Sequence, residues 1–306
     1  MSELKRILFI VNRYAGKNQI VGRLTDLLDL FSQKGYLTTV HVTRCAGDAT
    51  RIANELGAQY PLVVCSGGDG TLSEVIAGLV ELPKEERPAV GYIPAGSTND
   101  YAATLGLSID MNRSAAIVTE GFQQPLDVGM FGDHRSFVYV AGFGTFTETS
   151  YATPQREKNI LGYNAYLLHG LKELTNLRKY PLSVTMDGVT YEGEFLFGMV
   201  SNTDHVGGMH HPLGIEAVLD DGLLEVLLVR APETAAEWPQ LLSEVFSKKS
   251  DGRYLIYGRA KEIQFDFQNE VHWVLDGEHG GAHQNVTIRA MQQAIRFILP
   301  APKDEE

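Results

Sequence analysis

Short apolar segments alternate with helical patterns along the first third of the chain, and this alternation constrains the fold more than any other feature of the sequence. Strand composition is found in the segments "RILFIVN" (6–12), "LTTVHVT" (37–43), "PLVVC" (61–65) and "AVGYI" (89–93). Apolar residues recur at helical spacing between them, at 20–31 and at 48–56. Strands and helices that alternate at these lengths predict right-handed crossovers and a mostly parallel sheet with helices on both faces.

The second part of the chain is β-rich, with few helices between the strands. Residues 126–144 read as two strands around a polar turn at 132–135, and an Asp-Gly pair at 187–188 gives a strong hairpin signal. Further strand candidates are "GLLEVLLVR" (222–230), "EIQFDF" (262–267) and "VHWVLDG" (271–277). Helical stretches interrupt them at 163–177 and at about 232–248. This pattern predicts a mainly antiparallel β domain.

The predicted fold class is an α/β domain with a mostly parallel sheet, joined to a mainly antiparallel β domain. We expect residues 1–124 to form the first domain and residues 125–290 to form the second. The last segment, 291–306, contains the apolar run "AIRFILP" and either closes the second sheet or returns to the first domain. Two domains also agree with a length of 306 residues.

Composition excludes several classes of protein. The chain has 26 Lys and Arg against 38 Asp and Glu, a formal net charge of -12, which argues against a nucleic-acid partner. No run of about 18 apolar residues is present, so no transmembrane helix is expected, and the N-terminal apolar segment is too short for a signal peptide. Cys45 and Cys65 have no metal-ligand spacing and exclude a disulfide framework, so the cytoplasm is the expected compartment.

A glycine-rich stretch, "VVCSGGDGTLSEVIAGL" (63–79), joins the third strand to a helix. Thr71 and Glu74 fit the Ser/Thr-x-x-Glu capping box, which predicts that the helix begins at Thr71 and runs to about Leu79. A glycine loop before a helix presents free N–H groups and the positive end of the helix dipole, as a phosphate site requires. The alternative is a tight turn without a ligand, since the stretch fits neither the Walker A nor the GxGxxG pattern.

Asp69 lies among these glycines and favours the phosphate interpretation. A carboxylate beside bound phosphate calls for a divalent cation between them, and Mg²⁺ commonly bridges carboxylates and phosphate oxygens. A second polar loop, "GYIPAGSTNDYA" (91–102), follows the next strand, although Asn99 or Asp100 alone would suit a helix N-cap. Two such loops at the carboxyl ends of neighbouring parallel strands define the crevice where α/β sheets bind ligands. Together they favour a nucleotide site.

These loops and several other segments resemble, in the same order, the motifs of the diacylglycerol-kinase catalytic domain, in particular of the soluble bacterial lipid kinases. The segments are "VNRYAGK" (11–17), "SGGDGTLSEVIAGL" (66–79), "PAGSTNDYA" (94–102), "AGFG" (141–144), "LGYNAYLLHGLKEL" (161–174), "DHVGGM" (204–209), "LDDGLLEV" (219–226) and "LDGE" (275–278). Arg13 and Ala15 depart from the family's NPxSG pattern, whereas Asn12, Gly16 and Lys17 match it. NAD kinases and phosphofructokinases share a GGDGT-like element, but the ordered set covers nearly the whole chain and is specific.

The resemblance implies an NAD-kinase/diacylglycerol-kinase-like fold and an enzyme that transfers the γ-phosphoryl group of ATP to the hydroxyl of a diacylglycerol-like lipid, in a cleft between the domains. Mapped by motif, the residues that would bind the nucleotide are Asn12, Lys17, Thr43, Gly67, Gly68, Asp69, Gly70, Thr71, Leu72, Ser73, Ser97, Asn99 and Asp100. Ser97 stands where the family more often has threonine, and it keeps the hydroxyl. Asp69 and Asp100 would act through Mg²⁺ and its waters.

The "LDGE" segment matches the family's catalytic site. The resemblance therefore implies that Asp276 and Glu278 are catalytic together with Asp69, with Asp276 as the base. A hydroxyl nucleophile needs a nearby carboxylate to accept its proton, while the rest of phosphoryl transfer is positioning and charge neutralisation. Taken alone, "VLDGEHGG" (274–281) would be interpreted as a type I′ hairpin turn, and the order of the motifs favours the catalytic interpretation.

Two further segments bear on metal binding. "LDDGLLEV" resembles the family's structural Mg²⁺ loop, in which Asp221 would supply a carboxylate and Val218 and Leu223 would supply carbonyl oxygens; a plain Asp-Gly turn is the alternative. His205 and the adjacent histidine pair at 210–211 lack the spacing of a zinc site. A substrate-side loop is the favoured interpretation of these histidines.

A lipid substrate requires contact with a membrane, and one helical stretch offers a candidate surface. Its apolar stripe is Tyr163, Tyr166, Leu167, Leu171, Leu174 and Leu177, with Lys172, Arg178 and Lys179 beside or after it. Such a face suits a bilayer surface, although packing on a sheet is its commoner use. The expected location is the cytoplasm, peripheral to the inner face of the membrane, with a role in lipid metabolism and phospholipid biosynthesis.

Two alternatives remain open. A kinase for a soluble substrate such as NAD would need polar ribose contacts, whereas an apolar cleft wall from "AGFGTF" (141–146) and "FLFGMV" (195–200) would favour a lipid. A nucleotide- or lipid-binding regulator without catalysis is the other alternative, and the intact carboxylates of the two loops and of "LDGE" argue against it. The sequence does not fix the lipid, its acyl chains or the oligomeric state, and a homodimer is compatible with it.

Overall fold

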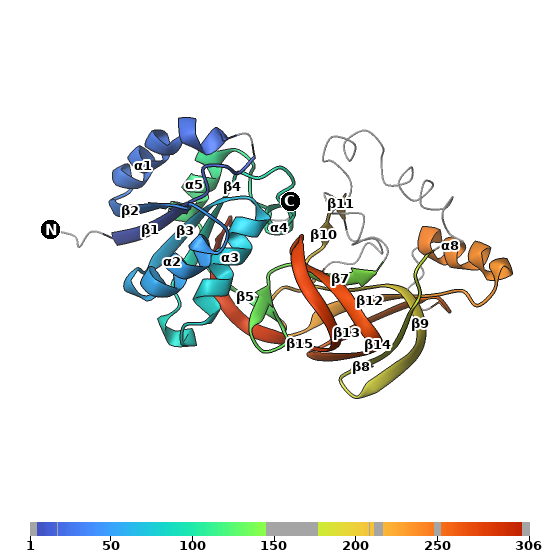
Figure 1. The fold of residues 1–306 in the computed structure, drawn as a ribbon. Coiled ribbons are helices and arrows are strands. Elements are labelled where there is room, and N and C mark those ends of the chain that lie inside the picture. Colours follow the sequence, from blue (N-terminus) through green and yellow to red (C-terminus); the bar gives the residue numbers. More distant parts are fainter. Residues whose placement is uncertain are drawn as a thin grey trace.

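The computed structural model describes residues 5–16, 18–144, 177–207, 209–210, 217–247 and 252–301. An α/β domain from the first part of the chain lies beside a β-rich domain from the rest (Figure 1). The helix expected at 163–177 lies outside the described residues, apart from Leu177. Among the residues that are described, none of the helices combines the length and the apolar character needed to cross a membrane.

The first domain is built on a parallel sheet, as the alternation predicts. Its strands are β1 (Lys5–Val11), β2 (Tyr36–Val42), β3 (Leu62–Gly67) and β4 (Ala89–Pro94). They lie in the order β4-β3-β1-β2, and each neighbouring pair is parallel. All six residues of β3 and of β4 are buried, because helices cover both faces of the sheet.

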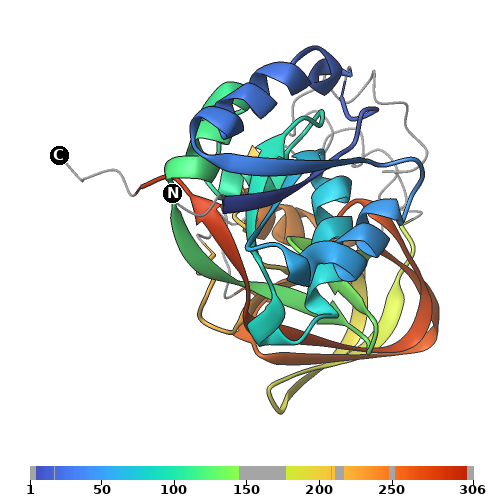
Figure 2. The same ribbon diagram turned by 90° about the vertical axis from the view of Figure 1, so that its left-hand side faces the viewer.

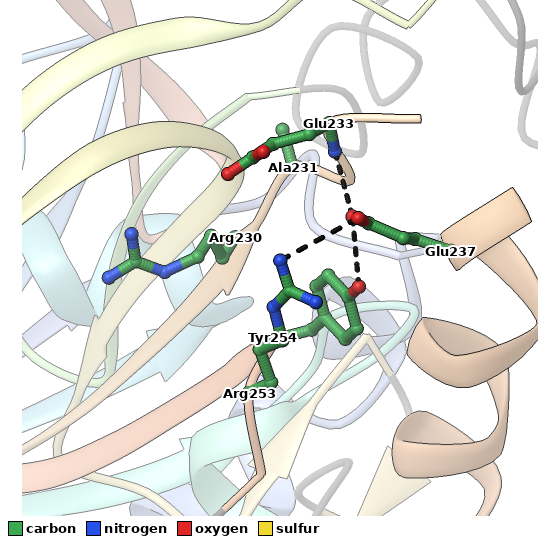
Figure 3. Close-up of a pocket in the computed structure, with 6 residues that line it drawn as sticks. All are labelled: Arg230, Ala231, Glu233, Glu237, Arg253 and Tyr254. Carbon is green, nitrogen blue, oxygen red and sulfur yellow. Dashed lines mark hydrogen bonds and ion pairs between the residues drawn. The ribbon is translucent and has the colours of Figure 1, made fainter. Parts of the chain in front are cut away.

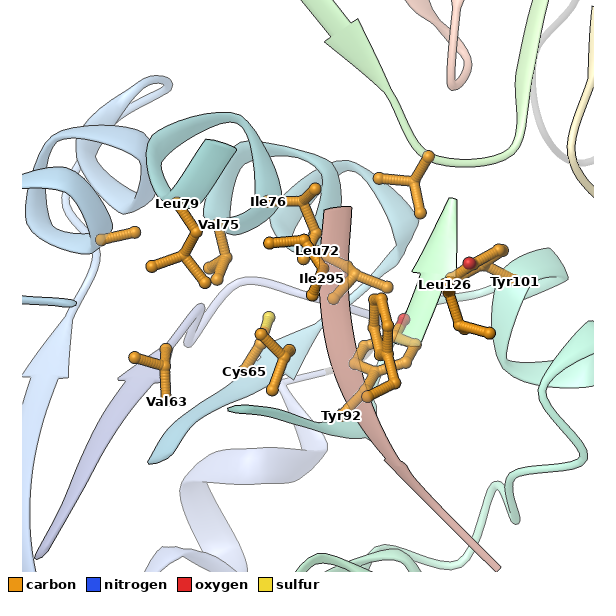
Figure 4. Packing of buried hydrophobic residues seen from close by; sticks show 14 of the residues in the cluster. Val63, Cys65, Leu72, Val75, Ile76, Leu79, Tyr92, Tyr101, Leu126 and Ile295 are labelled. Carbon is orange, nitrogen blue, oxygen red and sulfur yellow. The ribbon is translucent and has the colours of Figure 1, made fainter. Parts of the chain in front are cut away.

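Helices pack on both faces of this sheet. The longer ones are α1 (Leu24–Gln33), α2 (Asp48–Leu56), α3 (Asp69–Val80) and α5 (Met111–Glu120), and the shorter ones are η1 (Gln19–Gly22), η2 (Gly57–Gln59), η3 (Lys84–Glu86) and α4 (Asp100–Thr104). The buried side chains of α2 and α3 share one core cluster, in which Val75 and Leu79 of α3 lie over Val63 and Cys65 of β3 (Figure 4). Those of α1 and α5 share a second cluster with the opposite face of the sheet.

The helix after the glycine loop begins earlier than the capping box predicts. β3 extends to Gly67 rather than ending at Cys65, and α3 begins at Asp69 rather than at Thr71. Gly68 is the N-cap residue and makes no side-chain cap hydrogen bond. The capping-box prediction at this helix is therefore wrong.

The side chains of the expected capping pair bond to other parts of the chain. The Thr71 hydroxyl accepts a hydrogen bond from Nδ2 of Asn12 (2.9 Å). The Glu74 carboxylate accepts from the N–H groups of Gly47 (2.8 Å) and Ala49 (3.2 Å), at the start of α2. Glu74 thus caps the neighbouring helix instead of its own.

The second domain is mainly antiparallel, as predicted. Its larger strands are β5 (Phe122–Phe131), β6 (Arg135–Phe137), β7 (Val140–Gly144), β8 (Tyr180–Met186), β9 (Val189–Ser201), β12 (Leu224–Arg230), β13 (Leu255–Ala260), β14 (Glu262–Leu275) and β15 (Glu278–Leu299). The remaining elements are β10 (His205–Val206), β11 (Met209–His210), η5 (Ala235–Glu237) and α8 (Trp238–Ser247). Asp187 and Gly188 have φ angles of 44° and 89° and form the predicted hairpin between β8 and β9.

The core of this domain lies inside a closed group of strands. β9 and β14 each pair with both β7 and β8, so the four strands form a ring. Aromatic side chains fill it, and the ring centroid of Phe143 lies 4.9 Å from that of Phe267 and 5.0 Å from that of Trp273. Phe143 and Phe195 are buried in this core, so they do not form the apolar cleft wall expected of their segments.

One strand joins the two domains. β15 pairs with β14 and β5 in antiparallel fashion and with β4 in parallel fashion, where Arg296 lies opposite Ala89. Figure 2 shows this strand, in red, passing from the β-rich part to the α/β part. Residues 296–297 of the predicted segment 291–306 therefore lie beside β4. The division at residue 124 stays a prediction, because a single sheet runs through both parts.

The crossing of α2 and α3 depends on Gly78. A Cβ atom at this position would lie 2.2 Å from the carbonyl oxygen of Thr50 and 2.9 Å from Cβ of Ala53. We expect Gly78→Ala to lower the free energy of unfolding by about 1–3 kcal/mol, because the helices must separate. Gly22→Ala is the matched control, since an added Cβ meets nothing within 4 Å. Urea denaturation that gives equal stabilities for the two variants would contradict this contact.

Candidate active site

The N-terminus of α3 carries the features of an anion site. β3 ends at Gly67 and α3 begins two residues later, so the loop between strand and helix is very short. The N-cap residue, Gly68, supplies no capping side chain. The first N–H groups of a helix have no intrahelical acceptors, and the helix dipole adds positive potential. Backbone groups at this end of α3 are therefore suited to phosphate.

Close packing brings the two predicted loops together. A Cβ atom on Gly68 would lie 3.2 Å from Cα of Gly96, and one on Gly96 would lie 2.6 Å from Cα of Gly68. A Cβ atom on Gly70 would lie 3.4 Å from Oε1 of Glu278, which comes from the second domain. The predicted loop residues and one predicted catalytic residue thus meet at one place.

Asp69 connects the two loops directly. Its carboxylate accepts hydrogen bonds from the N–H groups of Asp100 (3.0 Å) and Tyr101 (3.3 Å), which begin α4. Asn99 is the N-cap residue of α4, but its side chain makes no cap hydrogen bond. Asp69 therefore caps a helix that belongs to the other loop. This role accounts for a carboxylate among the glycines without a cation.

The surroundings of Asp69 disfavour its charge. Burial raises its pKa from 3.8 to about 6 against the opposing effect of its two N–H donors, and the nearby charges of Asp100 and Asp276 raise it further. Asp69 is therefore a carboxylate whose ionisation costs free energy in the folded protein. A cation at this position would lower that cost.

The second loop is tied to the first and to the β domain. Asn99 bonds twice to Gly96, accepting from its N–H (2.9 Å) and donating to its carbonyl oxygen (3.1 Å). Asp100 is buried, and its Oδ2 accepts from the N–H of Gly207 (2.7 Å), next to β10. Ser97 is exposed on this loop. The side chains of Asn99 and Asp100 thus hold the loop in place, whereas Ser97 faces outward.

The remaining predicted nucleotide residues surround the same edge of the sheet. Asn12 and Thr71 are in contact through their side chains (2.9 Å). Thr43 is buried, and its hydroxyl donates to a carbonyl oxygen at the end of β1 (3.4 Å). The side chain of Leu72 packs in the core, so only its backbone could face a ligand. Lys17 lies outside the described residues.

The "LDGE" segment forms a tight hairpin. Asp276 and Gly277 join β14 to β15 with φ angles of 48° and 82°, the conformation of a type I′ turn. The hairpin interpretation is therefore right about the backbone. It does not account for the aspartate, whose side chain is buried with only 4% exposed.

The Asp276 carboxylate is held by both domains. Oδ1 accepts from the N–H groups of Tyr139 (3.0 Å) and Val140 (3.1 Å). Oδ2 accepts from the N–H group of Val138 (2.7 Å) and from the hydroxyl of Ser73 (2.5 Å), which lies on α3. Burial raises the pKa of Asp276, and these hydrogen bonds oppose the rise. A predicted catalytic residue and the predicted phosphate helix are therefore in direct contact.

Tyr139 marks the place where the predicted carboxylates converge. Its phenol is buried, and its pKa is raised well above the ordinary value first by burial and then by the charges of Asp276, Asp69, Asp100 and Glu278. These carboxylates come from α3, α4 and the β14–β15 hairpin. No motif pointed to Tyr139, because an aromatic residue in a β-rich segment is ordinary core composition.

The 218–223 segment forms a turn in which the carboxylate of Asp221 is paired with an arginine. The N–H of Leu223 donates to Oδ1 of Asp221 (3.0 Å), and Gly222 has a φ of 80°. The guanidinium of Arg259 pairs with the other carboxylate oxygen of Asp221. Val218 is 45% exposed. The Asp-Gly turn is present, and it leaves the metal prediction untested.

Asp127 is a buried carboxylate that no sequence motif indicated. Its Oδ2 accepts from the N–H of Gly222 (2.6 Å) and its Oδ1 from the N–H of Gln293 (2.7 Å), so it ties the turn to β15. Its pKa is raised first by burial, while the charges of Asp221 and Asp220 act in the same direction. The available signal was a carboxylate within the apolar strand segment "LDVGMF".

A metal site made of side chains alone is not found in the described parts of the chain, where no three His, Cys, Asp or Glu residues are grouped to hold an ion. His205 instead bonds through Nδ1 to Oδ1 of Asp204 (2.6 Å). His211 lies outside the described residues, and only the backbone of His210 is described. Mg²⁺ at the loops would therefore need phosphate oxygens or water as further ligands, which is its usual habit.

A separate cavity lies away from this site. It has a volume of about 320 Å³ and is lined by Arg230, Ala231, Glu233, Glu237, Arg253 and Tyr254 (Figure 3). Two of its charged side chains are paired, since Glu237 lies 3.6 Å from Arg253 and also accepts from the Tyr254 hydroxyl (3.0 Å). None of the predicted site residues lines it, so it is not part of the candidate active site.

Comparison with protein families assigns both domains. Residues 6–131 match the diacylglycerol kinase catalytic domain, and residues 143–299 match the YegS C-terminal NAD kinase beta sandwich-like domain. The uncapped helix after β3, the converging carboxylates and this pair of domains define a two-domain phosphotransferase with an alcohol acceptor.

Similar proteins match over most or all of the chain. The diacylglycerol kinase of Bacillus subtilis (strain 168) is 32% identical over 305 residues, 99% of each chain, and that of Staphylococcus aureus (strain bovine RF122 / ET3-1) is 32% identical over 283 residues, 90% of this chain and 87% of the relative. A crystal structure from Bacillus anthracis str. Sterne, assigned to the diacylglycerol kinases, superposes with a TM-score of 0.82 at 26% identity, over 98% of this chain and 97% of the other. The chain belongs to the diacylglycerol kinase family.

The raised pKa of Asp69 predicts a pH dependence of stability. The folded protein keeps the Asp69 proton up to about pH 6, whereas the unfolded chain loses it near pH 3.8. The contribution of Asp69 to the free energy of unfolding is therefore fully present below pH 3.8 and is lost as the pH rises through 6. As the pH rises from 4 to 7, we expect the free energy of unfolding of Asp69→Asn to increase relative to that of the wild type, by at most about 3 kcal/mol. Urea denaturation in EDTA measures it, and a difference that does not change with pH would contradict the assignment.

Proposed function

We propose that the protein is an ATP- and Mg²⁺-dependent kinase that transfers the γ-phosphoryl group of ATP to the hydroxyl of a diacylglycerol-like lipid. Family membership supports a lipid kinase, and the relatives from Bacillus and Staphylococcus carry the name diacylglycerol kinase. The observation that carries the proposal is the hydrogen bond between Ser73 of the phosphate helix and Asp276 (2.5 Å). A loop suited to phosphate thus adjoins a carboxylate suited to accept a proton.

The nucleotide side of the proposal rests on the start of α3. The N–H groups of its first turn would hold the phosphates, since Gly68 leaves them without a cap. The contact between Asn12 and Thr71 supports the loop from behind. Thr43 lies next to β1 and before α2, where the adenine side of the nucleotide would lie. Ser97 is exposed at the facing loop and available for a ligand.

The concentration of negative charge supports a divalent cation at this site. Four carboxylates act on Tyr139, and a bound triphosphate would add more negative charge at the same place. The carboxylates of Asp69 and Asp100, together with phosphate oxygens and water, make a donor set that suits Mg²⁺. When bound, Mg²⁺ would neutralise charge on the phosphates during transfer. In this proposal Asp69 and Asp100 hold the ion and also keep the two loops together.

Asp276 is the proposed base. It is buried beside the phosphate helix, and burial raises its pKa toward the range in which a carboxylate accepts protons effectively. Glu278 lies on the other side of the hairpin, close to Gly70, and is exposed. Its carboxylate therefore lies at the start of α3, where it would act on the acceptor.

The surface next to Asp276 favours a lipid acceptor over NAD. The N–H of Val140 donates to Asp276, and the half-buried Val140 side chain packs in a cluster whose other half-buried members include Phe197 and Val206. Partly exposed apolar side chains therefore begin at Val140, beside the proposed base. A lipid acceptor would bring the protein to a membrane surface, and we expect it in the cytoplasm with transient contact to the inner face of the membrane.

Phosphate transfer can be measured directly. Labelled ATP and MgCl₂ are incubated with the protein and with diacylglycerol in detergent micelles, other lipid alcohols, or NAD. We expect label on diacylglycerol, and a turnover that requires Mg²⁺. Label on NAD alone would replace the lipid hypothesis with the soluble-substrate alternative. No label with any acceptor, while the protein binds ATP, would favour the regulator.

The base assignment predicts that Asp276→Asn lowers the rate of transfer by about 10²–10⁴-fold. ATP binding should be retained, because Asp276 lies on the acceptor side. The new amide must face backbone N–H donors on one edge, so a lower melting temperature is also expected, and the assay is run where the variant is folded. Asp266→Asn, at an exposed position of β14, is the matched control. Equal incorporation of label by wild type and Asp276→Asn would sink the assignment.

A second Mg²⁺ site is proposed at the 218–223 turn. The carboxylates of Asp127, Asp220 and Asp221 lie close enough to act on one another electrostatically. This negative charge is the observation that supports a cation there. Asp221 would supply a carboxylate and the backbone of Val218 and Leu223 would supply carbonyl oxygens, with Asp221 released from its guanidinium partner. Such oxygen ligands suit Mg²⁺.

This second site predicts an effect of Mg²⁺ on stability without ATP. We expect MgCl₂ to raise the melting temperature of the wild type by about 2–4 °C. Asp221→Asn should abolish the rise, because the ion loses its carboxylate. Asp100→Asn, which removes a ligand of the other proposed site, should leave most of it. Differential scanning calorimetry measures the melting temperatures. A wild-type melting temperature that does not change when MgCl₂ is added would rule out the site.

A further inference from the structure

Every lone-pair position of the Asp276 carboxylate is in use. Tyr139 and Val140 donate to Oδ1, while Val138 and Ser73 donate to Oδ2. A carboxylate offers about four such positions, two on each oxygen. A substrate hydroxyl can give its proton to Asp276 only at a position that one of these donors releases.

The donors differ in how readily they can be released. Three are main-chain N–H groups of 138–140, which lead directly into β7. The carbonyl oxygen of Tyr139 accepts from the N–H of Asn202 (3.0 Å), and that of Val140 accepts from the N–H of Asp276 (2.9 Å), so this backbone is held in place. The fourth is the hydroxyl of Ser73, which turns about a single side-chain bond without any backbone movement. The position held by Ser73 is therefore the one that can open.

We propose that Ser73 is a positioning residue, whose hydroxyl holds the Oδ2 position of Asp276 until the acceptor hydroxyl replaces it. The inference rests on the proposed function, in which Asp276 is the base. It also changes the expected role of Ser73, from a nucleotide ligand to a partner of the base. Because Ser73 follows the phosphate loop directly on α3, the same helix serves the nucleotide and the base.

The chemical step that follows is balanced. The proton of the acceptor hydroxyl passes to Oδ2 of Asp276, and the acceptor oxygen forms a bond to the γ-phosphorus of ATP. The bond between this phosphorus and the bridging oxygen breaks, so ADP leaves with that electron pair. The Ser73 hydroxyl, turned away from Oδ2, is then free to donate to an oxygen of the acceptor or of the phosphate.

The hydrogen bond from Ser73 affects the pKa of Asp276 because, in the described part of the chain, no positively charged group is among those found to act on this carboxylate. Asp69 of α3, Tyr101 of α4 and Tyr139 interact electrostatically with Asp276, and Glu278 follows it on β15. All of them are neutral or negative, so none favours the ionised carboxylate. Among the hydrogen bonds that oppose the rise of the Asp276 pKa, that of Ser73 has the largest effect.

The test compares Ser73→Ala and Ser73→Thr with the wild type over a range of pH. For Ser73→Ala we expect the acidic limb of kcat/KM for the lipid acceptor to move up by about one pH unit, because the base loses one charge-assisted hydrogen bond. Ser73→Thr keeps a hydroxyl and should restore the limb. KM for ATP should change less than twofold in both. Ser32→Ala, at an exposed position of α1, is the control for replacing a helical serine.

Other outcomes would overturn the proposal. A higher KM for ATP with an unmoved limb would make Ser73 a nucleotide ligand. A uniform loss at every pH, with a lower melting temperature, would make it only a structural residue.

A second readout does not depend on activity. The carboxyl carbon of Asp276 is titrated by NMR in protein with ¹³C-labelled aspartate, and its resonance is assigned with Asp276→Asn. Titration at higher pH in Ser73→Ala supports the pairing even where the wild type transfers no phosphate, which would refute the proposed function alone. Active wild type with unchanged titration in Ser73→Ala would refute the role of Ser73 alone.

Discussion

The continuity of β15 through both domains is the constraint on which the active site depends. The strand begins at Glu278, directly after the hairpin that carries Asp276, and near its end it pairs with β4. The register of β15 against β5 shifts between Met291 and Ile295, where Gln293 has a φ of 50°. The pairing with β14 and β5 before this irregularity, and with β4 after it, sets where the hairpin lies relative to the parallel strands. The Asp276 carboxylate reaches α3 because of this geometry, and neither domain alone contains the contact.

Elements with a local cause could be predicted from the sequence. The buried strands of the first domain appear as apolar runs, α2 spans the predicted residues 48–56, and the Asp-Gly pair at 187–188 forms the hairpin turn expected of it. The start of α3 was placed two residues late for a physical reason. A capping box requires side chains that serve their own helix, whereas Thr71 and Glu74 bond to partners far away in the sequence.

The site was only partly predictable, because its key partners are backbone groups. The motifs identified Asp69 and Asp276, and the structure gives each of them main-chain donors, from the start of α4 and from 138–140 respectively. Backbone N–H groups have no sequence signature, so no pattern could reveal them. Asp127 was missed because a single carboxylate within an apolar strand resembles an exposed position of that strand until its burial is known.

The glycines of the phosphate loop say less about a ligand than their number suggests. Gly67 leaves room for Thr71, and Gly68 lets the second loop approach at Gly96, so packing alone requires both. The N-termini of α3 and α4 differ in their suitability for an anion because a carboxylate already occupies one of them. Asp69 already places a carboxylate on the first N–H groups of α4, and an anion there would meet that charge, whereas α3 is uncapped. In the proposed function the phosphates would therefore bind at α3, whose N-cap residue supplies no capping side chain.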